Sequence, residues 1–158
     1  MKVRSATPAD VPVMMELAKS APTAADWPPE QYLKIFKPEQ PVTRHALIVE
    51  DAGQTPGFVV GRESQGGEWE LENLVVAAAA RRRGLGMRLL QELLRLANAK
   101  GATAILLEAR ESNQAARSLY LKWGACESGK RPGYYQNPKE NAILYKFSSS
   151  SQVKKSSK

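Results

Sequence analysis

Three consecutive arginines and two glycines form the segment whose residue types could do chemistry most directly. The segment 81–87 (RRRGLGM) follows a predicted strand and opens the strongest predicted helix. Glycines let backbone N–H groups approach a ligand closely, and the helix N-terminus and the arginines place positive charge there. We therefore predict a pyrophosphate-binding turn; the alternative is a basic turn with an ordinary helix cap. No Gly-Lys-Ser/Thr follows and a third glycine is missing, so the pattern is neither a P-loop nor a dinucleotide fingerprint.

The single cysteine and the single histidine limit the other chemistries that the chain could perform. Cys126 alone excludes an intramolecular disulfide and a multi-cysteine zinc site, and His45 alone excludes a site with two imidazoles, so no metal is expected. A Ser-His-Asp site would depend entirely on His45, which we predict to be a surface residue of a strand. Cys126 is predicted to be a small buried residue without a catalytic part.

Length and charge indicate one globular domain with an anionic ligand or partner. The chain has 158 residues and a net charge of +7. Residues 148–158 hold three lysines and no acid, and we predict a disordered Ser/Lys-rich tail there. The domain at 1–147 keeps 20 basic and 16 acidic residues, an excess too small for a dedicated nucleic-acid binder. The apolar runs are too short for a membrane span and no secretory signal is visible, so a cytoplasmic protein is expected.

Apolar periodicity and turn residues predict alternating strands and helices in a mixed α/β (α+β) domain, not a pure doubly wound sheet. The hairpin around residues 52–56 is one reason for this prediction. In the predicted strand at 68–76, Trp69, Leu71, Asn73 and Val75 share one face by period two. The predicted strands are 2–6, 44–51, 57–62, 68–76, 104–109, 125–130 and 142–147; the predicted helices start at 7, 30, 84 and 113 and end near 22, 36, 100 and 123.

The arginine-glycine turn, with its flanking strands and helix, resembles the acetyl-CoA signature of the GNAT N-acetyltransferases. Residues 70–76 (ELENLVV) are similar to the family's fourth strand, and residues 106–120 (LLEARESNQAARSLY) to its fifth strand and following helix. The opening residues 4–10 (RSATPAD) extend the resemblance to 1–147, closest to the RimI type, which acetylates protein N-terminal amines. The resemblance implies a mostly antiparallel central sheet of about seven strands flanked by about four helices.

The same resemblance implies acetyl-CoA as cosubstrate and a set of residues that hold it. The backbone of Leu74, Val75 and Val76 would line the acetyl group and the pantetheine arm, and the side chain of Asn113 would contact the cofactor. The family's acidic Asp-Pro stretch before the arginines is replaced here by 77–80 (AAAA), and its Gly-Phe after the last helix by Gly-Ala at 124–125. The pyrophosphate would lie on Arg81, Arg82, Arg83, Gly84, Leu85, Gly86 and Met87.

Two residues twelve positions apart would carry the chemistry, as in the RimI pattern. The resemblance makes Glu108 the general base and Tyr120 the general acid. The residue types suit these roles, because an attacking amine must lose a proton and a leaving thiolate benefits from a donor. The alternatives are a strand-end glutamate paired with Arg110 or Arg117, and a core aromatic on a helix.

The acceptor would lie between two segments with aromatic side chains. In the family the loop that holds Trp27 walls the acceptor site, and Tyr134 and Tyr135, in a predicted loop, would bind an extended peptide backbone. The alternatives are a hydrophobic plug and packed loop aromatics. Glu70 and Glu72 share a strand face and could supply a second base or bind the amine, although solvent-facing carboxylates are commoner.

The expected function is therefore acetyl transfer to a protein N-terminal α-amine, with a ribosomal protein as a possible acceptor. Two alternatives stay open: an enzyme of this family acting on a small amine or a lysine side chain, and a non-catalytic basic module that binds RNA or the ribosome. Nucleic acid is not required by the first reading. The sequence does not indicate the oligomeric state.

Overall fold

A seven-stranded mixed sheet organises the chain, as predicted. The computed structural model describes residues 1–148 except 22–23, 26 and 38–40. The strand order is β1-β2-β3-β4-β5-β7-β6, and every neighbouring pair is antiparallel except β4 and β5. The strands are β1 (Lys2–Ser5), β2 (Arg44–Asp51), β3 (Gln54–Glu63), β4 (Glu68–Val76), β5 (Ala104–Arg110), β6 (Cys126–Tyr135) and β7 (Glu140–Ser148). The α-helices are α1 (Val11–Lys19), α2 (Pro29–Lys34), α3 (Leu85–Ala99) and α4 (Gln114–Trp123), with short 3-10 turns at Pro8–Asp10, Gln65–Gly67 and Ala78–Ala80.

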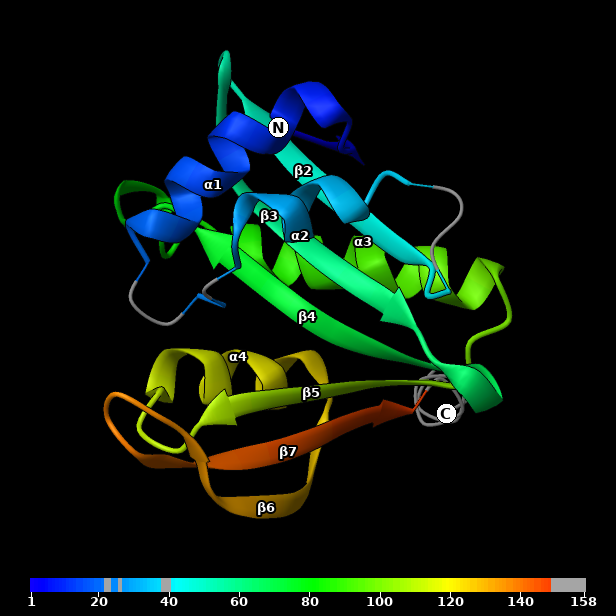
Figure 1. Cartoon of the computed structure of the whole chain (residues 1–158), viewed down its shortest axis with the longest axis vertical. Helices are drawn as coiled ribbons and strands as arrows, with labels where there is room; N and C mark the ends of the chain where they lie inside the picture. The colour runs from blue at the N-terminus through cyan, green and yellow to red at the C-terminus, as the bar shows by residue number, and fades with distance from the viewer. Residues whose placement is uncertain (22–23, 26, 38–40, 149–158) are drawn as a thin grey trace.

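The helices cover both faces of the sheet, and each face has its own hydrophobic core (Figure 1). One cluster joins the sheet to α1 and α2 and includes the buried side chains of Met14, Tyr32 and Phe58. The other joins it to α3 and α4 and includes Leu89 and Tyr120. Both clusters bury side chains that recur at helical or strand spacing, which accounts for the two-sided packing. No helix among the described residues is long and apolar enough to cross a membrane.

The two central strands β4 and β5 pair over only three positions. Their parallel ladder runs from Glu68 opposite Ala104 to Glu70 opposite Leu106, and beyond it the strands separate (Figure 1). On the other side of β4, Val60 pairs with Asn73 but the next residue, Gly61, pairs with Leu71. Glu72 is therefore the extra residue of a β-bulge, a feature that bends a strand and increases its twist.

The bulge corrects the prediction of one continuous face along β4. Trp69 and Leu71 pack in the α3/α4 cluster, whereas Val75 belongs to the α1/α2 cluster. Asn73 also lies on the α1/α2 side, because its amide oxygen accepts a hydrogen bond from the backbone N–H of Ala25, which precedes α2. Period-two alternation fails here because one inserted residue exchanges the faces of everything that follows.

Several predicted boundaries also change. The first hairpin turns within Ala52 and Gly53, both with positive φ, so β3 starts at Gln54 rather than at residue 57. Tyr134 and Tyr135 end β6 rather than lying in a loop, because Tyr135 pairs with Glu140 of β7. The predicted tail starts one residue too early, since position 148 is the last residue of β7, and residues 149–158 lie outside the described residues.

The predicted burial of Cys126 is wrong. This cysteine is exposed on β6, the last strand of the sheet, which pairs only with β7. His45 lies on β2 with its ring stacked on Trp69, at 4.7 Å between centroids, and its Nε2 is 2.7 Å from a carboxylate oxygen of Glu63. Neither residue is part of the group of side chains described below as the candidate site.

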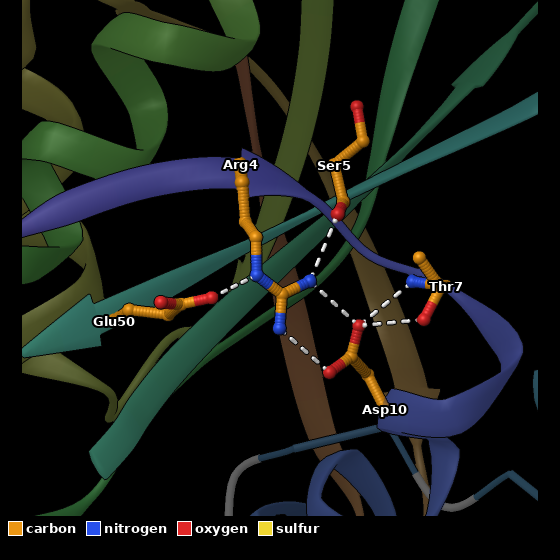
Figure 2. A network of polar contacts seen from close by, with 5 residues as sticks. All are labelled: Arg4, Ser5, Thr7, Asp10 and Glu50. Atoms are coloured by element: carbon orange, nitrogen blue, oxygen red, sulfur yellow. Dashed lines mark hydrogen bonds and ion pairs between the residues drawn. The ribbon is translucent and has the colours of Figure 1, made fainter. Parts of the chain in front are cut away.

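A partly buried ion pair fixes the start of α1 to the sheet (Figure 2). The guanidinium of Arg4 on β1 donates two hydrogen bonds to Asp10, at 2.8 and 2.9 Å, and also pairs with Glu50 of β2. Asp10 accepts a further bond from the backbone N–H of Thr7 at 2.7 Å, as a helix-start carboxylate does. Arg4 is the main cause that lowers the pKa of Asp10 from 3.8 to about 2.

We expect Asp10→Asn to lower the free energy of unfolding by about 2 kcal/mol near pH 7. The pKa of Asp10 is lower in the folded chain than in the unfolded one. The stabilisation is therefore present above about pH 4 and is lost as the pH falls toward 2. Urea unfolding at pH 7 and at about pH 3 measures this, with Glu16→Gln, an exposed change on α1, as control. An equal difference from the wild type at both pH values would contradict the assignment.

Candidate active site

The end of β4 presents backbone groups on the side where β5 has separated. Ala77 donates its N–H to Pro56 of β3 at 2.8 Å, so Ala77 faces β3. Backbone groups of successive strand residues point to alternate neighbours. The N–H and C=O of Val76 and Leu74 therefore point away from β3, toward the separated β5, whereas those of Val75 face β3. Of the three residues predicted to line the acetyl group and the pantetheine arm, Leu74 and Val76 therefore turn their backbone groups toward the space beside β5.

The start of α3 presents a row of free amide groups and exposed arginines. Gly84 precedes the helix with φ 77°, a left-handed conformation that favours glycine. The first hydrogen bond along α3 is donated by the N–H of Arg88 to the carbonyl oxygen of Gly84. The N–H groups of Leu85, Gly86 and Met87 come before it and have no partner within the helix. Arg81, Arg82 and Arg83 are exposed beside them, and Arg83 pairs with Asp51. These groups fit a diphosphate, which helix N-termini bind.

Gly86 has a packing role beside its predicted contact with a pyrophosphate. A Cβ at this position would lie 3.0 Å from Cδ2 of Leu119 and 4.0 Å from Cγ2 of Val76. The missing side chain therefore lets α3 approach α4 and the end of β4. A bulky residue at position 86 would first disturb this helix packing.

Glu108 lies on the opposite face of β5 from α4. Its neighbours Leu107 and Ala109 are buried in the α3/α4 cluster, so alternation directs Glu108 toward the other face. Neither predicted arginine partner binds Glu108 in the described part of the chain, since Arg110 bonds to the β6–β7 segment and Arg117 bonds to Tyr145 and Glu111.

The charge of Glu108 acts on three tyrosines. The pKa of Tyr134 is raised, first by the negative charge of Glu108 and then by burial and a hydrogen bond to that carboxylate. Burial first, and then the charge of Glu108, raises the pKa of Tyr135 to about 12. Glu108 also contributes to the raised pKa of Tyr120, so the predicted base, acid and acceptor-wall tyrosines lie in one neighbourhood.

Tyr120 reaches this neighbourhood from the α4 side of the sheet. Its side chain is buried and packs edge to face on Tyr145, with ring centroids 5.4 Å apart. The hydroxyl of Tyr145 accepts a hydrogen bond from Nε of Arg117 at 2.9 Å, which fixes the supporting ring. Burial is the main cause that raises the pKa of Tyr120, so its phenol keeps its proton throughout the neutral and mildly alkaline range.

Arg110 holds the segment that presents Tyr135, a role that sequence reasoning missed. It donates hydrogen bonds to the carbonyl oxygens of Gln136 and Pro138, both at 3.0 Å, and to Glu140 at 3.3 Å. Its guanidinium also lies 4.5 Å from the centroid of the Tyr135 ring. Glu140 in turn accepts from the backbone N–H of Ser112, which ties β7 to the turn before α4. The signal in the sequence is an arginine two residues after Glu108, hence on the same strand face.

The remaining predicted residues have local structural partners. Asn113 caps α4, and its Oδ1 accepts from the N–H of Ala116 at 3.1 Å, so its amide NH₂ is the group left to donate. Trp27 packs edge to face on Tyr32 at 5.3 Å and belongs to the α1/α2 cluster, not to the group around Glu108.

Glu70 and Glu72 are both ion-paired. Arg62 pairs with Glu70 and lies 3.9 Å from Glu72, and Arg44 donates to Glu72 at 2.7 Å. Their contact with one arginine agrees with a shared strand face. Both carboxylates therefore already neutralise arginine charge.

The arrangement combines three chemical capacities. The start of α3 can bind a diphosphate, the end of β4 can hold a polar chain through its backbone, and Glu108 and Tyr120 can accept and donate a proton. This combination suits acyl transfer from a phosphate-bearing carrier to a nucleophile.

Comparisons with known proteins agree with this geometry. Residues 11–125 match the model of the acetyltransferase (GNAT) family. The chain is 38% identical over 79 residues to the [ribosomal protein bS18]-alanine N-acetyltransferase of Salmonella typhimurium, covering 49% of this chain and 53% of that protein. The crystal structure of the ribosomal-protein-S18-alanine N-acetyltransferase from Escherichia coli matches with a TM-score of 0.79 and 26% identity, over 93% of this chain and 92% of that one.

A more distant structure and the lengths of the relatives complete the comparison. An aminoglycoside 6'-N-acetyltransferase complexed with coenzyme A matches with a TM-score of 0.77 at 18% identity, over 94% of this chain and 97% of that one, and so shares the fold. The matched segments span between 22% and 66% of the lengths of the curated relatives. The family match covers most of the chain, from α1 through α4, and so includes strands β2 to β5 and the arginine-glycine turn. The chain belongs to the GNAT acetyltransferase family.

Proposed function

We propose that this chain transfers the acetyl group of acetyl-CoA to the N-terminal α-amine of a polypeptide, with a ribosomal protein as a candidate acceptor. The observation that carries the proposal is the grouping of Glu108 with Tyr120, Tyr134 and Tyr135 beside the separated ends of β4 and β5. The similarity to the [ribosomal protein bS18]-alanine N-acetyltransferase of Salmonella typhimurium and to the ribosomal-protein-S18-alanine N-acetyltransferase from Escherichia coli supports the acceptor class.

The residues that would hold acetyl-CoA are those at the start of α3 and the end of β4. The N–H groups of Leu85–Met87, with Arg81 and Arg82, would bind the pyrophosphate. The backbone of Leu74 and Val76 would line the pantetheine arm and the acetyl group. The NH₂ group of Asn113 is the remaining donor from the start of α4. When bound, this cosubstrate supplies the acetyl group as a thioester.

The chain's own residues would then carry the two proton transfers. Glu108 accepts a proton from the acceptor amine, directly or through a water, as the amine nitrogen forms a bond to the acetyl carbon. The N–H of Val76 would stabilise the negative oxygen that develops. As the carbon–sulfur bond breaks, Tyr120 donates its proton to the leaving sulfur. Glu108 and Tyr120 act from opposite faces of β5, which keeps the two protons apart.

Two other acceptor classes compete with a peptide. The aminoglycoside 6'-N-acetyltransferase shows that a small amine can be acetylated on this fold, and a lysine side chain is chemically similar. A non-catalytic basic module that binds RNA is the alternative of another class, and the grouping of Glu108 with the buried phenol of Tyr120 argues against it. Tyr134 is 46% exposed beside Glu108, a position suited to a peptide backbone entering from solvent.

A panel of acceptors tests the proposal. We expect short peptides that begin with alanine or serine to be acetylated at the α-amine, and a single amino-acid amide to react more slowly. Binding energy from the second and third residues should appear in kcat/KM, and Tyr135→Ala should remove most of this difference. Mass spectrometry locates the acetyl group. Acetylation confined to lysine side chains, or a polyamine that reacts faster than every peptide, would favour the small-amine alternative.

We expect Glu108→Gln to lower kcat by about 10²-fold, the low end for a positioned general base. The remaining activity should rise with pH as the acceptor amine loses its own proton, near pH 8 for an α-amine. The pH dependence of kcat/KM on an alanyl peptide measures this, with Glu127→Gln on exposed β6 as the matched control. A wild-type rate in Glu108→Gln would move the base to Glu70 or Glu72.

We expect Tyr120→Phe to lower kcat by at least about tenfold while the affinity for acetyl-CoA stays unchanged. The phenol would act on the departing sulfur, which becomes basic only during the reaction. Calorimetry with acetyl-CoA and steady-state kinetics separate the two effects. Because the phenyl ring keeps the packing on Tyr145, a large loss of cosubstrate affinity would show that Tyr120 supports binding instead.

A further inference from the structure

Asn73 is a buried amide whose hydrogen-bond donor finds no partner in the described part of the chain. Its exposed fraction is 5%, and its Oδ1 accepts from the N–H of Ala25 at 3.4 Å. Its Nδ2 has no hydrogen-bond partner among the residues that the structure describes. Buried polar groups are almost always paired in folded proteins, so an unpaired amide N–H in the middle of the sheet requires an explanation.

The position of Asn73 relates it to Glu108. The last parallel pair places Glu70 and Leu106 side by side on one face of the sheet. Glu108 lies two residues further along β5, on the same face as Leu106. Asn73 lies three residues further along β4, and the bulge at Glu72 brings it to this same face. Where the two strands have separated, β5 therefore carries Glu108, the proposed proton acceptor, and β4 carries the unpaired donor of Asn73 on the same face.

We propose that Nδ2 of Asn73 donates a hydrogen bond to the carbonyl oxygen of the acceptor's first residue while Glu108 accepts the proton of its amine. This inference rests on the proposed function and makes Asn73 a specificity-determining residue. An α-amine of a polypeptide carries a carbonyl group on the adjacent carbon. A lysine ε-amine and a polyamine carry none, and would leave the buried donor unpaired. Such an unsatisfied group is a strong means of rejecting the wrong substrate.

The bond to Ala25 supplies a way to separate specificity from loop anchoring. Asn73→Asp keeps an oxygen that can accept from the N–H of Ala25 and removes the donor. Asn73→Leu removes both. Gln91→Glu, which adds the same charge at an exposed position on α3, is the matched control.

The experiment compares two acceptors in each variant. One is an alanyl peptide, and the other is its isostere in which a trans carbon–carbon double bond replaces the first peptide bond, so that the carbonyl is missing. The ratio of the two kcat/KM values is the readout, because a new charge or a shifted loop changes both values together. One hydrogen bond corresponds to a ratio of roughly tenfold in the wild type and in Gln91→Glu.

The expected result is a ratio that falls to about one in Asn73→Asp and Asn73→Leu. An unchanged ratio in Asn73→Asp would overturn the proposal. If both kcat/KM values fall by the same factor, the ratio is unchanged and Asn73 only anchors the loop. If Asn73→Leu does not fold, Asn73→Asp still decides. Failure of the wild type to acetylate the alanyl peptide would instead refute the proposed function, so the two failures are distinguishable.

Discussion

The structure depends on a sheet whose two central strands stop sharing hydrogen bonds. A strand edge presents unpaired N–H and C=O groups, and a folded chain pairs them with another strand, a side chain or a ligand. The parallel ladder between β4 and β5 ends at Glu70 and Leu106, and the bulge at Glu72 bends β4 at that point. The backbone of Leu74 and Val76 is thereby offered to a partner that is not part of the sheet. The basic turn before α3 follows directly along the chain.

The alternation of side chains on β5 divides the candidate site between the two faces of the sheet. Leu107 and Ala109 pack toward α3 and α4, where Tyr120 lies buried, and Glu108 points to the other face. The close approach of Gly86 to Leu119 keeps α4 against α3 and so keeps Tyr120 in place. In the proposed function, Glu108 and Tyr120 would therefore serve one reaction as proton acceptor and proton donor without a direct hydrogen bond between them.

Much of this could be predicted from the sequence because strong local signals agreed with the fold. The leucines of α3, the Ala52-Gly53 turn and the arginine-glycine segment each have local physical causes. The bulge at Glu72 could not be predicted, because it arises from pairing with β3 and leaves no mark in residue periodicity. The same holds for the extension of β6 to Tyr135, which depends on Glu140, and for Arg110, whose partners lie more than twenty residues away. The unused donor of Asn73 is visible only once the surrounding chain is in place.

Glu140 gives the site a mechanical property beyond its static geometry. Its two carboxylate oxygens hold Arg110, which fixes the chain around Tyr135, and the N–H of Ser112, which directly precedes Asn113. The segment that carries Tyr135 and the turn before α4 are therefore joined through one side chain. In the proposed function, the first would face the acceptor and the second the cosubstrate. A ligand that orders one of them would then reduce the conformational entropy lost when the other substrate binds, a thermodynamic coupling that requires no change of shape.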